Sequence, residues 1–219
     1  MKHRNHPRSA SVAIALMLTG LLLAWPEASL AQLGGLLPTP TTTTTATVVG
    51  DASAARVSVL GILGTATTTA LAGTGTLGGI NNSRDASAVT GSIPSILSAE
   101  TLSAATISWV DQVDSEVSLA NLRMTVAGIG LTADLVGSRA SQVLGAAGTG
   151  SSTLSNLSIN GTPISVTGLP NQTIWVPGGQ IVINEQTISS TGTAAVSALH
   201  VAITGVADVV IASATAGIS

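Results

Sequence analysis

The stretch LSNLSINGTPISVTGLPNQTIWVPGGQIVINE, residues 154–185, decides the fold class of this chain. Its first half has apolar residues at alternate positions on both sides of Asn160-Gly161. These apolar residues are Leu157, Ile159, Ile164 and Val166. Asn and Gly adopt positive φ at low cost, so this dipeptide between two alternating runs predicts a tight hairpin turn.

The second half repeats the pattern around a different turn. Ile174 and Val176 precede Pro177-Gly178-Gly179, and Ile181 and Ile183 follow it. Proline presets φ and glycine supplies positive φ, so this tripeptide also predicts a turn between short strands. Four strands in so short a stretch predict an antiparallel sheet.

Alternation of apolar and polar residues continues through most of the chain. It predicts strands at 57–59, 67–70, 129–136, 196–203 and 208–212. Two or three further strands are expected within 99–126, with a bulge or turn near Asp114-Ser115. The polar residues 81–87 and the Gly-rich residues 146–152 predict a turn and a loop.

The spacing of these turns favours one architecture. Short strands with turns every eight to twelve residues are typical of an antiparallel β-sandwich. A β-solenoid, of the kind that binds ice through ordered Thr arrays, is the alternative. The Gly and Thr residues of this chain have no fixed period, which a solenoid requires.

Composition restricts what the core can contain. Of 219 residues, 45% are apolar, yet the chain has no Phe, no Tyr and only three Trp. We therefore expect a closely packed core of Ala, Val, Leu and Ile. Trp109 is the only large side chain in its half of the mature chain, so we expect it to cap this core. The absence of Cys excludes disulfides and thiolate metal sites.

Residues 1–31 have the pattern of a secretory signal peptide. A positive segment with Lys2 and Arg4 precedes the apolar run 12–25. Ser29 and Ala31 then place small residues at −3 and −1 before Gln32, which fits leader peptidase cleavage. The run is too short to span about 30 Å of hydrocarbon. We expect the mature chain to begin at Gln32 without a transmembrane segment, and an uncleaved N-terminal anchor is the alternative.

The remainder divides into a linker and one domain. Residues 32–47, QLGGLLPTPTTTTTAT, are predicted to form an extended Thr/Pro-rich linker. Residues 48–219 are predicted to form a single all-β extracellular domain. Because no apolar tail precedes Ser219, we expect secretion or non-covalent retention at the cell envelope.

Charge excludes one class of partner. Beyond the signal peptide, four arginines against nine acidic residues give a net charge of −5. Nucleic-acid binding is not expected, because neutralising phosphates requires a basic patch. The partners that this composition favours are cell-wall or other envelope components, or further copies of the chain.

Five motifs occur in a fixed order between residues 160 and 214. They are Asn160-Gly161 with Pro163; Pro170-Asn171 with Thr173; Pro177-Gly178; Asn184-Glu185-Gln186; and Ala212-Ser213-Ala214. In this order they resemble the choice-of-anchor P family, bacterial exported proteins whose shared extracellular domain occurs with differing anchors. The resemblance implies an extracellular compartment and this architecture. It implies no activity and no catalytic residues.

His200 is the only histidine beyond the signal peptide. A hydrolase triad would need it together with a serine and a carboxylate. It lies within a predicted strand and is expected to face solvent, away from Leu199 and Val201. No Gly-x-Ser-x-Gly turn is present. We predict that the protein is not an enzyme, and a secreted hydrolase that uses His200 is the alternative.

The other candidate site residues have structural interpretations. Asp111, Asp114 and Glu116 could offer oxygens to Ca²⁺, but their spacing matches no calcium loop. We expect a solvated sheet edge there, and no metal or cofactor. Asn184-Glu185-Gln186 is expected to close a turn after a strand. Trp175 is expected to pack at the core or an edge; if exposed, it could stack on a sugar ring.

These patterns together predict the function only by class. We expect a secreted or cell-envelope-associated, non-catalytic β domain with a structural, adhesive or binding role.

Overall fold

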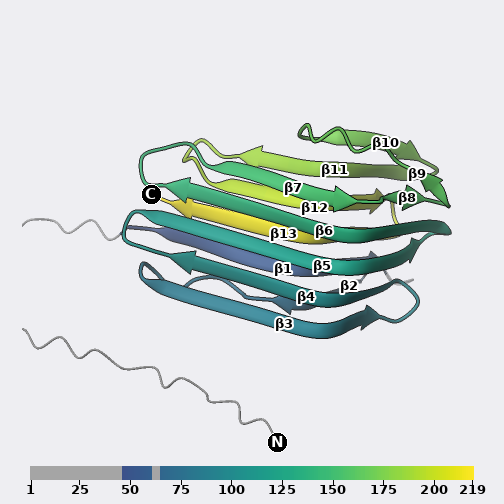
Figure 1. The fold of residues 1–219 in the computed structure, drawn as a ribbon, viewed down its shortest axis with the longest axis horizontal. Coiled ribbons are helices and arrows are strands. Elements are labelled where there is room, and N and C mark those ends of the chain that lie inside the picture. Colours follow the sequence, from purple (N-terminus) through teal and green to yellow (C-terminus); the bar gives the residue numbers. More distant parts are fainter. Residues whose placement is uncertain (1–45, 61–64) are drawn as a thin grey trace, which may run out of the picture. The chain divides into compact units, whose positions relative to one another are not determined.

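The structure is a computed structural model that describes residues 46–60 and 65–219. Each regular element in these ranges is a β-strand, and the strands form two antiparallel sheets packed together (Figure 1). This confirms the predicted all-β sandwich over the solenoid alternative. The predicted signal peptide and almost all of the predicted linker lie outside the described residues.

The described strands divide between a six-stranded and a seven-stranded sheet. The six-stranded sheet contains β1 (Val48–Leu60), β2 (Ala66–Gly73), β10 (Gln172–Val176), β11 (Gly179–Ile188), β12 (Ala194–Ile203) and β13 (Ala207–Ile218), in the order β10-β11-β12-β13-β1-β2. The seven-stranded sheet contains β3 (Asn82–Ile93), β4 (Leu97–Ser108), β5 (Gln112–Val126), β6 (Ile129–Val143), β7 (Thr149–Ser155), β8 (Ser158–Ile159) and β9 (Thr162–Pro163), in the order β3-β4-β5-β6-β8-β9, with β7 also paired to β6.

The core between the sheets is built from small and medium apolar side chains. Its members in the described residues are Ala, Val, Leu, Ile and Met124, and no tryptophan is among them. Trp109 is 41% exposed, so the prediction that it caps the core is wrong. It lies just beyond β4, in the turn where its main-chain N–H donates to the Gln112 carbonyl at 2.8 Å.

Two buried polar side chains link the sheets across this core. The Ser115 hydroxyl on β5 donates to the Thr215 carbonyl on β13 at 2.6 Å. Gln142 on β6 accepts the main-chain N–H of Ile218 at 2.9 Å and donates to the carbonyls of Ala146 and Thr191. A serine side chain is short, so its bond to β13 shows how closely the sheets approach each other.

The two predicted hairpin turns are present. Asn160 and Gly161 have φ of 49° and 76° between β8 and β9. Pro177-Gly178 joins β10 to β11, with Gly178 at φ 78°. The predicted strand through Ile164 and Val166 is shorter than expected, because β9 ends at Pro163 and residues 164–171 are irregular.

A line of backbone distortions crosses the six-stranded sheet. Asn184, Ala198, Ala212, Ala54 and Ala72 lie opposite one another on β11, β12, β13, β1 and β2. Positive φ occurs on alternate strands, at Asn184, Ala212 and Ala72. Burial changes phase at this line, so that even-numbered residues face the core on one side of it in β12 and odd-numbered residues on the other.

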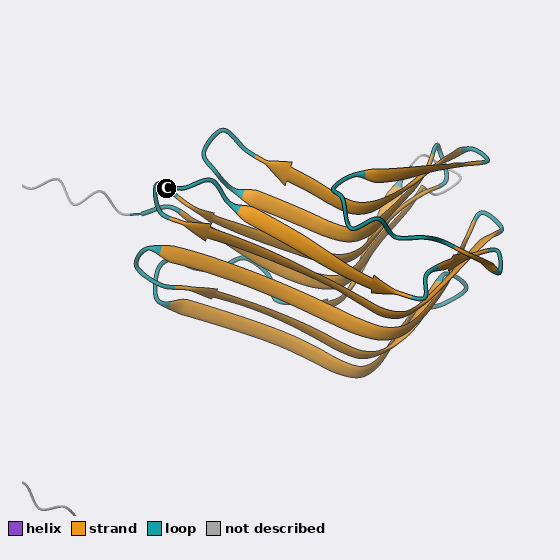
Figure 2. Ribbon diagram, turned by 45° about the horizontal axis from the view of Figure 1, so that its top comes forward, coloured by secondary structure: helices purple, strands orange, loops and turns teal. Residues whose placement is uncertain are grey.

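The seven-stranded sheet has a matching line, and Figure 2 shows the long strands bending. Thr101 on β4 and Asn121 on β5 have positive φ of 51° and 49°. Asn121 donates to Glu100 at 2.7 Å, and Asn156 donates to Asp134 on β6 at 2.7 Å. The predicted irregularity near Asp114-Ser115 is therefore misplaced: β5 is continuous there and changes phase at Asn121.

Other boundaries differ from the sequence prediction because edge pairing extends the strands. Residues 82–87, predicted as a polar turn, belong to β3, which pairs with β4 along its length. Residues 149–152, predicted as loop, begin β7, which pairs with β6. Small polar residues are compatible with strands whose outer side faces water.

The distortion at Ala212 predicts opposite effects of glycine at two neighbouring positions. Ala212 is fully buried at φ 51°, whereas Ala214, two residues along β13, is equally buried without positive φ. We expect Ala212→Gly to raise the free energy of unfolding by about 0.5–1 kcal/mol, because glycine relieves the strain. Ala214→Gly is expected to lower it by about 1 kcal/mol. Urea denaturation of the mature chain measures both, and equal destabilisation by the two variants would contradict the strain at Ala212.

Candidate functional site

His200 lies on the outer face of the six-stranded sheet, between two carboxylates. It is on β12, and its neighbours Leu199 and Val201 are fully buried, which confirms that its side chain faces away from the core. Its Nδ1 is 2.9 Å from Glu185 Oε2 on β11, and its Nε2 is 2.9 Å from Asp208 Oδ2 on β13. These two contacts link three strands, and the His200 side chain is only 20% exposed.

The environment of His200 favours its charged form. Burial alone lowers the pKa of the imidazole. Hydrogen bonds and negative charge from Asp208 and Glu185 outweigh that effect and raise the pKa above its usual 6.5. The folded protein therefore favours an imidazolium that donates to both carboxylates.

This geometry is unsuited to general-base catalysis. A catalytic histidine uses one ring nitrogen to take a proton from a nucleophile and the other to contact an orienting carboxylate. In His200 both nitrogens already face carboxylates, and no hydroxyl group of the described residues is hydrogen-bonded to the ring. The hydrolase alternative therefore has no nucleophile next to His200 in the part of the chain that the structure describes.

The three acidic residues considered for calcium are not brought together. Asp111 lies in the turn between β4 and β5. Asp114 accepts from Gln112 at 2.8 Å and lies 3.8 Å from Arg139, which also faces Glu116 across the β5–β6 pair. Among the described residues, no group of three or more His, Asp or Glu side chains is arranged to hold a metal ion.

The sequence predicted that Asn184-Glu185-Gln186 would close a turn after a strand. This prediction is wrong. The three residues lie within β11 at the line of distortion, and Asn184 is only 3% exposed. The Asn184 side chain donates to the Gly168 carbonyl at 3.1 Å and accepts from Gln186 at 2.8 Å. Asn184 thus holds the irregular segment 164–171 against β11, while Glu185 faces outward to His200.

Trp175, like Trp109, is exposed where the sequence predicted that it would pack against the protein. It is 78% exposed on β10, the edge strand of the six-stranded sheet, whereas Ile174 and Val176 pack against the core. Its cross-strand neighbours form what we call the Trp175 row: Trp175, Gln180, Ala202 and Asp208. The alternation in the sequence already placed the side chain of Trp175 on the other face of its strand from Ile174 and Val176. The position of β10 at an edge depends on the whole sheet.

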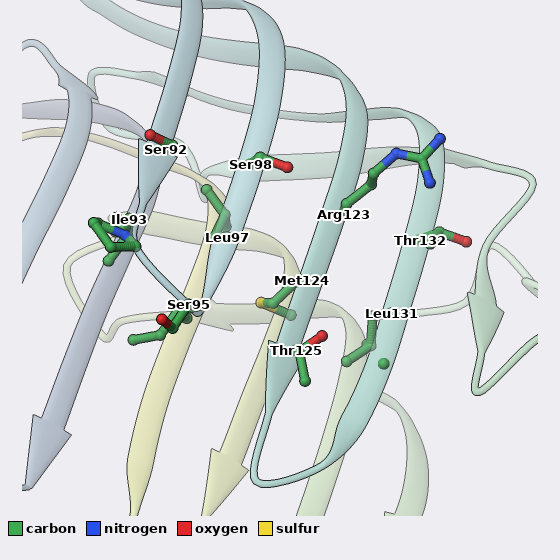
Figure 3. Close-up of a pocket in the computed structure, with 13 residues that line it drawn as sticks. Ser92, Ile93, Ser95, Leu97, Ser98, Arg123, Met124, Thr125, Leu131 and Thr132 are labelled. Atoms are coloured by element: carbon green, nitrogen blue, oxygen red, sulfur yellow. The ribbon is translucent and has the colours of Figure 1, made fainter.

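A hollow lies at the other sheet, around the β3–β4 turn at residues 94–96 (Figure 3). It has a volume of about 510 Å³ and is lined by core residues such as Leu97 and Met124 and by several hydroxyl groups. Arg123 is the one charged side chain among its lining residues, all of which lie in the described chain. Without a carboxylate or histidine, this hollow has no acid–base pair for catalysis.

Comparison with known protein families, curated proteins and solved structures finds no match to this chain. The resemblance to the choice-of-anchor P family therefore stays a prediction from the motifs. No helix among the described residues is long and apolar enough to cross a membrane.

The His200 cluster predicts a pH-dependent contribution to stability. Because the folded-state pKa lies above 6.5, this stabilisation is complete below about pH 6.5 and is lost as the pH rises through the folded-state pKa. We expect His200→Gln to lower the free energy of unfolding more at about pH 6 than at about pH 9. Urea denaturation at both pH values measures this, with Asp208→Asn as a variant that weakens the same dependence. An identical effect of His200→Gln at both pH values would contradict it.

Proposed function

We propose that this protein is an exported, non-catalytic β-sandwich domain that acts in the cell envelope or outside the cell by binding. The observation that carries the proposal is the state of His200, the only histidine beyond the predicted signal peptide. Its two nitrogens bond to Glu185 and Asp208, so it orders the outer face of the sheet and is not free to activate a nucleophile. Export rests on the signal-peptide pattern of residues 1–31 and on the family resemblance.

A structural role through self-association is a second candidate, favoured by β2. This strand is an edge of the six-stranded sheet, and its sequence ATTTALAG has no charged residue and no proline. Residues 66–70 are all exposed. Charge and proline are the usual means by which edge strands avoid pairing with other chains, so β2 is open to pairing with a second copy.

Export is tested by fractionating the native host and sequencing the mature N-terminus by mass spectrometry. We expect the chain to begin at Gln32 and to be found in the wall fraction or the medium. A chain that still begins near Met1 would mean that the N-terminal segment is retained as an anchor, and the export part of the proposal would be wrong.

The absence of catalysis is tested by a broad esterase and glycosidase screen of the purified mature chain. We expect no hydrolysis above background, because His200 has no free nitrogen toward a nucleophile. His200→Ala is the informative variant: hydrolysis by the wild type that this variant loses would establish the hydrolase alternative instead.

A further inference from the structure

The Trp175 row crosses four adjacent strands in one line. Trp175 on β10 is paired with Gln180 on β11. Gln180 is in turn paired with Ala202 on β12, and Ala202 with Asp208 on β13. The apolar neighbours of these residues along each strand pack against the core, so the row faces outward. Figure 1 shows β10, β11, β12 and β13 side by side in this order.

The row is long enough for an extended binding surface, and a hollow of about 330 Å³ adjoins its Asp208 end. Adjacent strands are about 4.8 Å apart, so three steps from Trp175 to Asp208 span about 14 Å. Ala202 has no bulky side chain to interrupt this line. Beyond Asp208 the row continues through Ser58 and Thr68, whose hydroxyl groups are 2.9 Å apart.

Trp175 is a large apolar surface with no partner in the described domain. A tryptophan can bury about 150–250 Å², yet this side chain is 78% exposed, on a domain whose core contains no aromatic residue. An exposed indole does not stabilise the fold, because its apolar faces are not removed from water. The ring is available to stack on a flat ligand that has an apolar face.

The other end of the row offers fixed polar groups. Asp208 is 56% exposed and bonds to His200 through Oδ2. Its Oδ1 makes no hydrogen bond within the described residues. Because His200 is itself bonded to Glu185, the Asp208 carboxylate is held in place before a ligand arrives. Gln180, between the indole and the carboxylate, adds an amide that can both donate and accept.

A ligand for this surface must combine apolar faces with many hydroxyl groups. Protein interfaces usually have an apolar core of several clustered side chains, and Trp175 is the only large apolar residue in the row. The cationic groups of this face, Arg56 and His200, are paired with the carboxylates of Asp51, Glu185 and Asp208, so the face gives no free cluster of positive charge for an anionic polymer. Sugar rings have apolar C–H faces and equatorial hydroxyl groups, which donate hydrogen bonds to carboxylates and to amide oxygens.

The geometry points to a polysaccharide-binding site along the Trp175 row, with a sugar ring stacked on Trp175 and a neighbouring sugar hydrogen-bonded by Gln180 and Asp208. The ligand class is a neutral, extended glycan of the cell envelope or the surroundings of the cell. This inference names the ligand of the binding domain under Proposed function and rests on that proposal.

The test measures binding of the mature chain to insoluble cellulose, chitin and wall polysaccharide purified from the host, by depletion from solution. We expect at least one of these to bind the wild type, and Trp175→Ala to weaken that binding by about tenfold or more. Trp109→Ala is the matched control, because Trp109 is also exposed but lies at the β4–β5 turn of the other sheet. It is expected to bind like the wild type.

Two further variants define the polar end of the site. Asp208→Asn and Gln180→Ala are expected to weaken binding severalfold, while thermal unfolding shows that each variant remains folded. Binding that is unchanged in Trp175→Ala would overturn the site. Failure of all three polysaccharides to bind would overturn the ligand class. The proposed function would still stand in that case if the chain begins at Gln32 and has no hydrolytic activity. Retention in the host wall through a protein partner alone would likewise overturn the ligand class.

Discussion

The close approach of the two sheets is the constraint on which the rest of this structure depends. A core of Ala, Val, Leu, Ile and one Met fills less depth than a core with aromatic residues, so the sheets must come near each other to exclude water. Glycine is required where they do. A Cβ at Gly50 on β1, for example, would lie 2.6 Å from Thr106 Oγ1 on β4 of the other sheet. The same closeness allows Ser115 and Gln142 to reach β13 and satisfy buried polar groups that would otherwise be costly.

The lines of distortion let long strands serve this thin core. A straight strand of twelve to fifteen residues accumulates twist, which would carry its ends away from the opposite sheet. Bulge-like breaks reset both the direction of the strand and the face on which its side chains lie. In β12 the break falls at Ala198, so His200 faces outward while Leu199 and Val201 face the core. The position of the His200 cluster therefore follows from the bend.

The His200 cluster and Trp175 act on the same outer face in different ways. Glu185, His200 and Asp208 belong to three neighbouring strands and hold one another in fixed positions. Trp175 contributes little to the core and stands at the edge of the sheet. The binding surface proposed above combines the exposed ring with an ordered carboxylate three strands away, because binding costs less when the contacting groups are already in place. Catalysis would instead need a free base beside a nucleophile.

The sequence by itself determined the fold class, the two hairpin turns and the composition of the core. Alternation along residues 154–185 and 196–212, with Asn160-Gly161 and Pro177-Gly178 between strands, depends only on local geometry. Tertiary structure alone decided which strands lie at edges, and hence that Trp175 is exposed. It also decided that Asn184 and Ala212 interrupt strands instead of ending them. Such a break requires the regular pairing to be interrupted at opposite residues on the neighbouring strands as well. The pairing of Glu185, His200 and Asp208 was equally hidden, since register between strands sets which side chains meet.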